Sequence, residues 1–414
     1  MAGVKRLAEN NARIQIDRPA EGVMKVLILT DDHVGQAMAG SALRAWELSC
    51  SLVREGHHVR LAARPGSSAP SDHGPMVVGR PPWSWAEAII APPWSLAPRA
   101  FLPGHLLVID GITPLLAELN AMEPTAEIQR RLRTAAARLP LVSARADAVL
   151  TGGPNQVEWW SSRIRGRFGL PYLNVPFGIP DQPPTADVGA LPSVPDGWAV
   201  VLWWGGVWPW LDLETLLAAR ARLGSSPVSI VVPTAARPGG RHPEISTSDL
   251  HTMARAHGLK PPQIVALETW IPYNERHRVL NRASLVAVLH TPSEEAALSF
   301  RTRALDALWA GVPLLLTEGG EVARQARDHG WGGVVPPSDP RAVAAAMELL
   351  LSRREQARCR VAMTGDRDRW TWAKVTRPIV DILPDLPCVP RRALVPAVLR
   401  SALVLARRQS KALA

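Results

Sequence analysis

The residues best suited to chemistry lie in a loop and helix around position 300. His290, Glu294 and Glu295 directly follow a predicted strand, and ligands of parallel α/β sheets bind at the carboxyl ends of strands. Ser299 is expected to cap the next helix, which places Arg301 in its first turn. A cation is unfavourable there unless an anion lies beside it, so Arg301 indicates a bound phosphate. The alternative is a surface ion pair between Arg301 and Glu294 or Glu295.

Two further residues of this helix belong to the same candidate site. Arg303 adds a second cation to the first turn. Asp306 lies about two turns into the helix, where its carboxylate would reach ribose hydroxyls if the helix starts lower than the pattern indicates. We expect this segment to contact a nucleotide substrate, with His290 as a further substrate contact.

A second loop, Trp203–Asp212, connects a predicted strand to a predicted helix. Gly205 and Gly206 allow the backbone to come close to a phosphate, and the helix N-terminus supplies free N–H groups and partial positive charge. Phosphate contact and a plain turn both remain open. Four tryptophans in the loop favour core or interdomain packing, with a sugar platform formed by Trp208 as the alternative: Trp203, Trp204, Trp208 and Trp210.

Loops of the N-terminal half form a third group. The segments Gly35–Arg44, Pro92–Trp94 and Asp110–Gly111 each follow a predicted strand, so all three are expected to face the C-terminal half across a cleft. Asp110 is a candidate base or acceptor ligand, although a strand-end Asp also caps turns. No Asp-x-Asp metal motif lies near these loops, which predicts a metal-independent site.

Apolar runs alternate with helical patterns through most of the chain, which predicts an α/β fold. The N-terminal strands are expected at residues 25–30, 59–62, 88–91, 106–110 and 148–151. The C-terminal strands are expected at residues 199–204, 228–232, 264–267, 285–289, 312–317 and 333–335. The repeated strand, helix, strand order predicts two doubly wound parallel sheets.

This alternation divides the chain into two domains of similar size. We expect a loose extension at 1–23, an N-terminal acceptor domain at 24–190, a C-terminal donor domain at 197–375, and a crossover with a basic tail at 376–414. The proline-rich stretch from Pro171 to Pro195 is the predicted linker.

Composition narrows the function classes. The chain has 414 residues and a formal net charge of +10. Six of the excess charges lie in the acid-free tail: Arg391, Arg392, Arg400, Arg407, Arg408 and Lys411. The rest is nearly balanced, which argues against a nucleic-acid partner. The three separated cysteines indicate neither zinc nor disulfides, and the sequence offers neither a signal peptide nor an 18-residue apolar run, so we expect a cytoplasmic protein.

The motifs at 203–212 and 299–311 resemble those of the GT-B retaining glycosyltransferases of family 4. One bacterial branch carries a strand ending in Trp-Gly-Gly and the helix Ser-Phe-Arg-Thr-Arg-x-Leu-Asp-x-Leu-Trp-Ala-Gly, and this chain has both. Glu268–Tyr273 resembles the family's Gly-Trp-Val-Pro segment, and Ala39–Leu48 resembles its first glycine loop and following helix. The resemblance covers roughly residues 24–350. It implies the GT-B fold, in which two Rossmann-like domains face a central cleft.

The resemblance also implies roles for individual residues. Gly40 and Arg44 would lie on the phosphate or acceptor side, and Gly205 and Gly206 beneath the donor. The stretch around Trp270 would flank the nucleotide base.

The helix at 299–311 would contact the rest of the donor. Ser299, Phe300 and Arg301 would approach the diphosphate, while Asp306 replaces the family's ribose-binding glutamate. The commoner pattern has a second glutamate eight residues earlier, where this chain has leucine. Glu295 would take over its role at the sugar hydroxyls.

The implied reaction moves a glycosyl group from a nucleoside diphosphate sugar to an acceptor hydroxyl, with retention and without a metal or other cofactor. The acceptor would be a saccharide, a lipid-linked molecule or a small natural product, in cell-surface glycan or natural-product synthesis. A nucleotide-sugar epimerase or a non-catalytic nucleotide-sugar-binding relative is the alternative. Arg301, Glu295 and Asp110 are the candidate catalytic residues, and replacing Arg301 by Ala is expected to abolish turnover with little loss of folding.

The basic tail carries a separate hypothesis. After Pro396 its apolar and basic residues separate onto two helix sides, as in a helix on an anionic membrane surface. That would place the protein at the inner face of a membrane. Packing of this helix against the N-terminal domain is the alternative.

Overall fold

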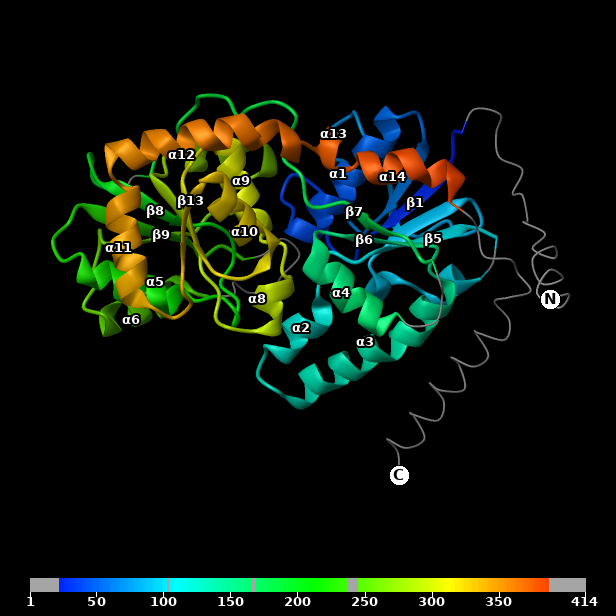
Figure 1. Ribbon diagram of the computed structural model, residues 1–414, viewed down its shortest axis with the longest axis horizontal. Helices are drawn as coiled ribbons and strands as arrows, with labels where there is room; N and C mark the ends of the chain where they lie inside the picture. The colour runs from blue at the N-terminus through cyan, green and yellow to red at the C-terminus, as the bar shows by residue number, and fades with distance from the viewer. Residues whose placement is uncertain (1–21, 103, 165–168, 192, 237–244, 387–414) are drawn as a thin grey trace, which may run out of the picture.

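The computed structural model describes residues 22–102, 104–164, 169–191, 193–236 and 245–386. Two parallel sheets form the centres of two lobes that lie side by side (Figure 1). The basic tail at 391–414 and nearly all of the extension at 1–23 lie outside the described residues, so the membrane hypothesis stays a prediction. In the part of the chain described, no helix is long and apolar enough to cross a membrane.

The N-terminal sheet has seven strands in the order β3-β2-β1-β4-β5-β6-β7, all paired in parallel. They are β1 (Lys25–Leu29), β2 (His58–Ala62), β3 (Met76–Val78), β4 (Ala88–Ala91), β5 (Leu106–Asp110), β6 (Ala148–Thr151) and β7 (Tyr172–Asn174). The central strands β4, β5 and β6 are buried along their whole length, as expected for a parallel sheet covered on both faces. The helices of this lobe are α1 (Gly40–Arg54), α2 (Leu115–Asn120), α3 (Ala126–Arg145) and α4 (Pro154–Arg163).

The C-terminal sheet has six parallel strands in the order β10-β9-β8-β11-β12-β13. They are β8 (Ala199–Trp203), β9 (Val228–Pro233), β10 (Ile264–Leu267), β11 (Leu285–Val288), β12 (Leu314–Thr317) and β13 (Gly332–Val335). Its helices are α5 (Leu213–Arg222), α6 (Thr247–Ala256), α7 (Arg276–Leu280), α8 (Glu294–Leu298), α9 (Thr302–Ala310), α10 (Gly320–His329), α11 (Pro340–Leu350) and α12 (Arg353–Asp366). Asp212 caps α5 by accepting a hydrogen bond from Thr215 N, as its position in the sequence predicts.

The strand order of each sheet locates the place where a ligand can bind. β1 lies next to β4, and β8 lies next to β11, so the chain reverses its direction of winding between these pairs. Loops diverge at such a switch point and leave a crevice at the carboxyl ends of the strands. The chemically promising segments after β1, β8 and β11 therefore all belong to crevices.

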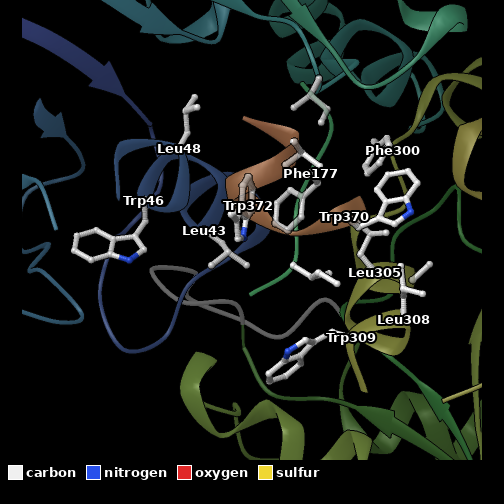
Figure 2. Close-up of a cluster of buried hydrophobic side chains, with 14 of the residues drawn as sticks. Leu43, Trp46, Leu48, Phe177, Phe300, Leu305, Leu308, Trp309, Trp370 and Trp372 are labelled. Atoms are coloured by element: carbon white, nitrogen blue, oxygen red, sulfur yellow. The ribbon is translucent and has the colours of Figure 1, made fainter. Parts of the chain in front are cut away.

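The C-terminal end of the described chain returns to the first lobe. α13 (Trp372–Val375) packs against α1, and α14 (Arg377–Ile382) packs against β7. Figure 2 shows Trp372 beside Phe177, with ring centroids 4.9 Å apart. Gly178 makes room for this indole, because a Cβ there would lie 2.7 Å from it. The crossover thus begins before residue 376, the position at which the sequence analysis placed its start.

Two short strands fall where the sequence gave no strand pattern. β7 lies inside the proline-rich stretch predicted as linker, and β3 lies in the irregular region after residue 65. Both are three-residue edge strands of the sheet. Because backbone pairing with a neighbouring strand fixes them, their own residues show no period.

Candidate active site

The two lobes enclose a cleft of about 760 Å³ that both sheets line with the loops at their strand ends. Nearly all the residues singled out from the sequence lie on its wall: Gly40, Arg44, Gly205, Gly206, Trp208, Trp270, His290, Glu295, Ser299, Phe300, Arg301 and Asp306. Asp110 is not part of the lining, although its partner Arg44 is. The three loop groups predicted separately therefore meet in one place.

Arg301 lies at the floor of the cleft with 2% of its surface exposed. Its guanidinium donates hydrogen bonds to the carbonyl oxygens of Thr317, Glu318 (3.0 Å) and Ala296 (3.4 Å). Its Nε is buried and has no hydrogen-bond partner among the described residues. Burial lowers the pKa of Arg301 to about 10, with Glu295 opposing that shift, so the group stays cationic at neutral pH.

These contacts correct two expectations about Arg301. The alternative of a surface ion pair with Glu294 or Glu295 is wrong, because Arg301 is buried and Glu294 instead pairs with Arg163 at 3.0 Å. Arg301 also precedes the helix and occupies the N-cap position of α9. Ser299, predicted as that cap, ends α8 with extended backbone.

His290 and Glu295 form a second buried polar group beside Arg301. Their Nε2 and Oε2 atoms are 3.8 Å apart, and each side chain is 4% exposed. Burial, followed by Arg301 and Arg303, holds the pKa of His290 well below its ordinary value, so this imidazole is neutral. Burial raises the pKa of Glu295 to about 7. Within the described chain, His290 Nδ1 and Glu295 Oε2 have no hydrogen-bond partner, and both residues face the cleft.

Asp306 is held by two donors of the C-terminal lobe. It accepts hydrogen bonds from Trp204 Nε1 and from Arg276 Nε, both at 2.9 Å. The Arg276 guanidinium in turn lies over the rings of Tyr273, at 3.7 Å, and Trp309, at 4.2 Å. Sequence reasoning missed Arg276, because its partner is thirty residues away in the chain. Asp306 remains in the cleft lining, so the ribose role stays a prediction.

The Trp-Gly-Gly loop forms the opposite edge of this part of the cleft. Gly205 has a φ of +100°, and a Cβ there would lie 3.1 Å from the Arg303 guanidinium carbon. Arg303 Nη1 donates to the carbonyl of Gly206 at 3.1 Å. The rings of Trp208 and Trp210 stack with centroids 5.3 Å apart and an interplanar angle of 3°. The lack of a side chain at Gly205 thus leaves room for the Arg303 guanidinium. The stacked tryptophan rings give the cleft a flat apolar wall.

Two helix N-termini approach each other across the cleft. α1 begins at Gly40 and α9 begins at Thr302, and in neither helix does a side chain cap the first turn. A Cβ on Gly40 would lie 3.7 Å from Thr302 Oγ1. Uncapped N–H groups carry partial positive charge, so both helices add to the positive electrostatic potential that Arg301 creates in the cleft.

Arg44 and Asp110 are paired with each other. Arg44 Nε lies 2.8 Å from Asp110 Oδ2, and its Nη atoms donate to the carbonyls of Val175 at 2.9 Å and Pro176 at 3.0 Å. Arg44 is only 2% exposed. This geometry favours a structural role, in which the pair joins α1 to β5 and to the segment after β7.

No protein-family model matches the sequence, and no curated protein matches it. Sucrose-phosphate synthase from Thermosynechococcus elongatus superposes with a TM-score of 0.64 at 16% identity, covering 88% of this chain and 99% of its own. Anabaena HepE in complex with UDP-glucose gives 0.62 at 16%, covering 88% and 100%. WaaG, a glycosyltransferase involved in lipopolysaccharide biosynthesis, gives 0.61 at 12%, covering 86% and 99%.

The chain has the GT-B fold. The two Rossmann-like domains and the cleft predicted from the sequence are thereby confirmed. At these identities the likeness concerns the fold, and the chemistry has to be argued from the residues of the cleft.

Proposed function

We propose that this chain is a glycosyltransferase that moves a sugar from a nucleoside diphosphate sugar to an acceptor hydroxyl. The observation that carries the proposal is the position of Arg301, a buried cation in the cleft lining that lies next to the uncapped start of α9. A diphosphate is the kind of anion that such a group stabilises. The structurally similar HepE contains UDP-glucose, which supports this class of donor.

The proposed reaction breaks the bond between the sugar's anomeric carbon and the diphosphate oxygen. The acceptor oxygen bonds to that carbon, and the proton of the acceptor hydroxyl passes to the departing diphosphate. Negative charge accumulates on the departing diphosphate. Arg301, Arg303 and the N-termini of α1 and α9 surround the cleft where this charge would appear. Preorganised positive groups lower the barrier most where charge develops, so we propose a metal-independent reaction.

We further propose that the anomeric configuration is retained and that the enzyme acts in the cytoplasm. The proposal of retention rests on the motif resemblance. Glu295, neutral in part at pH 7, is suited to hydrogen bonds with sugar hydroxyls, because a carboxyl group near its pKa both donates and accepts.

The first experiment measures thermal stabilisation by UDP, GDP, ADP and dTDP, each in large excess. A ligand far above its dissociation constant stabilises a protein by about 2–4 kcal/mol, which gives a clear shift in melting temperature. We expect one diphosphate to produce this shift. No shift with any of the four would contradict the proposed donor site.

A second experiment separates transfer from epimerisation. The sugar conjugate of the diphosphate that binds is incubated with the enzyme alone and the sugar is identified. We expect it to keep its configuration at every carbon. Conversion to an epimer without acceptor would identify an epimerase instead.

A further inference from the structure

Glu118 is a carboxylate of the N-terminal lobe that lines the cleft on the side of Glu295. It lies on α2, which packs against α8, the helix that carries Glu295 (Figure 1). Glu118 lies outside the motifs that the sequence singled out, because it directly follows neither a predicted strand nor a glycine loop. The two glutamates therefore face one cleft from opposite lobes.

Glu295 has unused hydrogen-bonding capacity. Its Oε2 is buried and has no hydrogen-bond partner in the described part of the chain, and its neighbour His290 is equally short of a partner at Nδ1. A buried polar atom without a partner costs about 1–3 kcal/mol, so such atoms in a cleft indicate a missing ligand. The ligand has to supply hydrogen-bond donors to a carboxylate.

The charged and polar groups around Glu295 define that ligand further. Burial and then the negative charge of Glu118 raise the pKa of Glu295, while Ser299, Arg301 and Arg303 lower it. Glu118 is thus the charged group that raises the pKa of Glu295 most strongly. Two carboxylates that approach each other are stabilised by a neutral group that donates to both. Sugar hydroxyls have this property, whereas a diphosphate does not.

We propose that Glu118 and Glu295 together bind the hydroxyl groups of the transferred sugar, so that both domains hold the sugar ring. Glu118 is then a sugar-binding residue that makes sugar recognition depend on the closed arrangement of the lobes. This inference rests on the proposed glycosyltransferase function, and the experiments below separate the failure of one from the failure of the other.

The ligand-free test measures the coupling of the two carboxylates. A raised pKa means that the folded protein binds the proton of Glu295 more tightly than the unfolded chain, so stability falls as pH rises from the ordinary 4.5 through about 7. Glu118→Gln removes part of the repulsion. We expect the melting temperature of this variant to exceed that of wild type at pH 8 but not at pH 5. In the Glu295→Gln background, the effect of Glu118→Gln on the melting temperature should no longer depend on pH.

The binding test compares UDP, GDP, ADP and dTDP with their glucose, galactose, mannose and N-acetylglucosamine conjugates by calorimetry. For the nucleotide sugar that binds best, we expect Glu118→Gln and Glu295→Gln each to lower the binding affinity by about tenfold. The free diphosphate should bind as in wild type. Glu123→Gln is the control, since Glu123 is an exposed glutamate five residues along the chain and outside the cleft lining.

The outcomes are distinguishable. If no diphosphate binds, the proposed function fails and this inference with it. If a diphosphate binds but Glu118→Gln leaves the difference in affinity between the nucleotide sugar and the free diphosphate unchanged, only the role of Glu118 is overturned. A double variant whose shift in melting temperature from wild type equals the sum of the two single-variant shifts at every pH would likewise overturn the pairing.

Discussion

Arg301 both lines the cleft and holds the backbone around it in place. It donates to three backbone carbonyls, one at the last residue of β12, one directly after that strand and one in α8. Replacing Arg301 by Ala leaves those carbonyls without their donor. In place of the small loss of folding expected from the sequence, we therefore expect a loss of about 1–3 kcal/mol in the free energy of unfolding. Diphosphate-dependent stabilisation should disappear as well. Urea denaturation and thermal melting with ligand measure the two effects.

Arg327→Ala is the matched control for this prediction. Arg327 is an exposed arginine of α10 whose guanidinium lies 3.3 Å from Glu318 Oε1. Its replacement should change stability by less than about 0.5 kcal/mol and leave the ligand response intact. An Arg301→Ala protein with unchanged stability and a normal melting shift would contradict the role assigned here.

The sequence identified the C-terminal site residues better than the N-terminal ones. His290, Glu295 and Arg301 lie in one short segment between the end of β11 and the start of α9, so their proximity follows from local spacing. Arg44 and Asp110 are 66 residues apart, and their ion pair depends on how α1 packs over β5. A single sequence contains no signal for such a distant pair, and the same limit hid Arg276 and Glu118.

The conformation of the Trp-Gly-Gly loop depends on Gly205. At a φ of +100° an alanine is strained, and its Cβ would press on the Arg303 guanidinium. We expect Gly205→Ala to cost about 1–3 kcal/mol and to weaken diphosphate binding, as measured by urea denaturation and by calorimetry. Gly224→Ala is the control, because Gly224 also has positive φ but a Cβ there meets nothing within 4 Å. Equal effects of both variants on binding would argue against the loop's role.

The regular elements were predictable for a physical reason. Buried strands such as β4 and β5 consist of continuous apolar runs between turn residues, and that pattern survives in the sequence. The break between α8 and α9 was not predicted. There the side-chain amide of Gln156 donates to the Leu298 carbonyl at 2.7 Å. The break thus depends on a helix of the other lobe, which local propensity does not reveal.

Several regions of the described chain join the two lobes, and three of them bear on how the lobes close. The crossover places Trp370 near Phe300 and Trp372 near Phe177 (Figure 2). The cleft brings together the starts of α1 and α9. Between them, Tyr273 of the C-terminal lobe donates its hydroxyl to Glu47 Oε1 at 3.0 Å and its backbone N–H to the Gln36 carbonyl at 3.1 Å. Deleting the hydroxyl oxygen of Tyr273 removes the first of these two hydrogen bonds and leaves the second in place.

Tyr273→Phe should therefore weaken the closed arrangement in a pH-dependent way. Burial raises the pKa of Glu47, and the Tyr273 hydroxyl lowers it, so losing the hydroxyl raises this pKa further. The folded protein then binds the proton of Glu47 more tightly, and its stability deficit grows as pH rises from 5 to 8. We expect a loss of about 1–3 kcal/mol at pH 8, with a larger radius of gyration in small-angle scattering. Tyr172→Phe, at the chain's other tyrosine on β7, should change neither quantity. A Tyr273→Phe deficit that is the same at both pH values would show that Glu47 does not ionise in this contact.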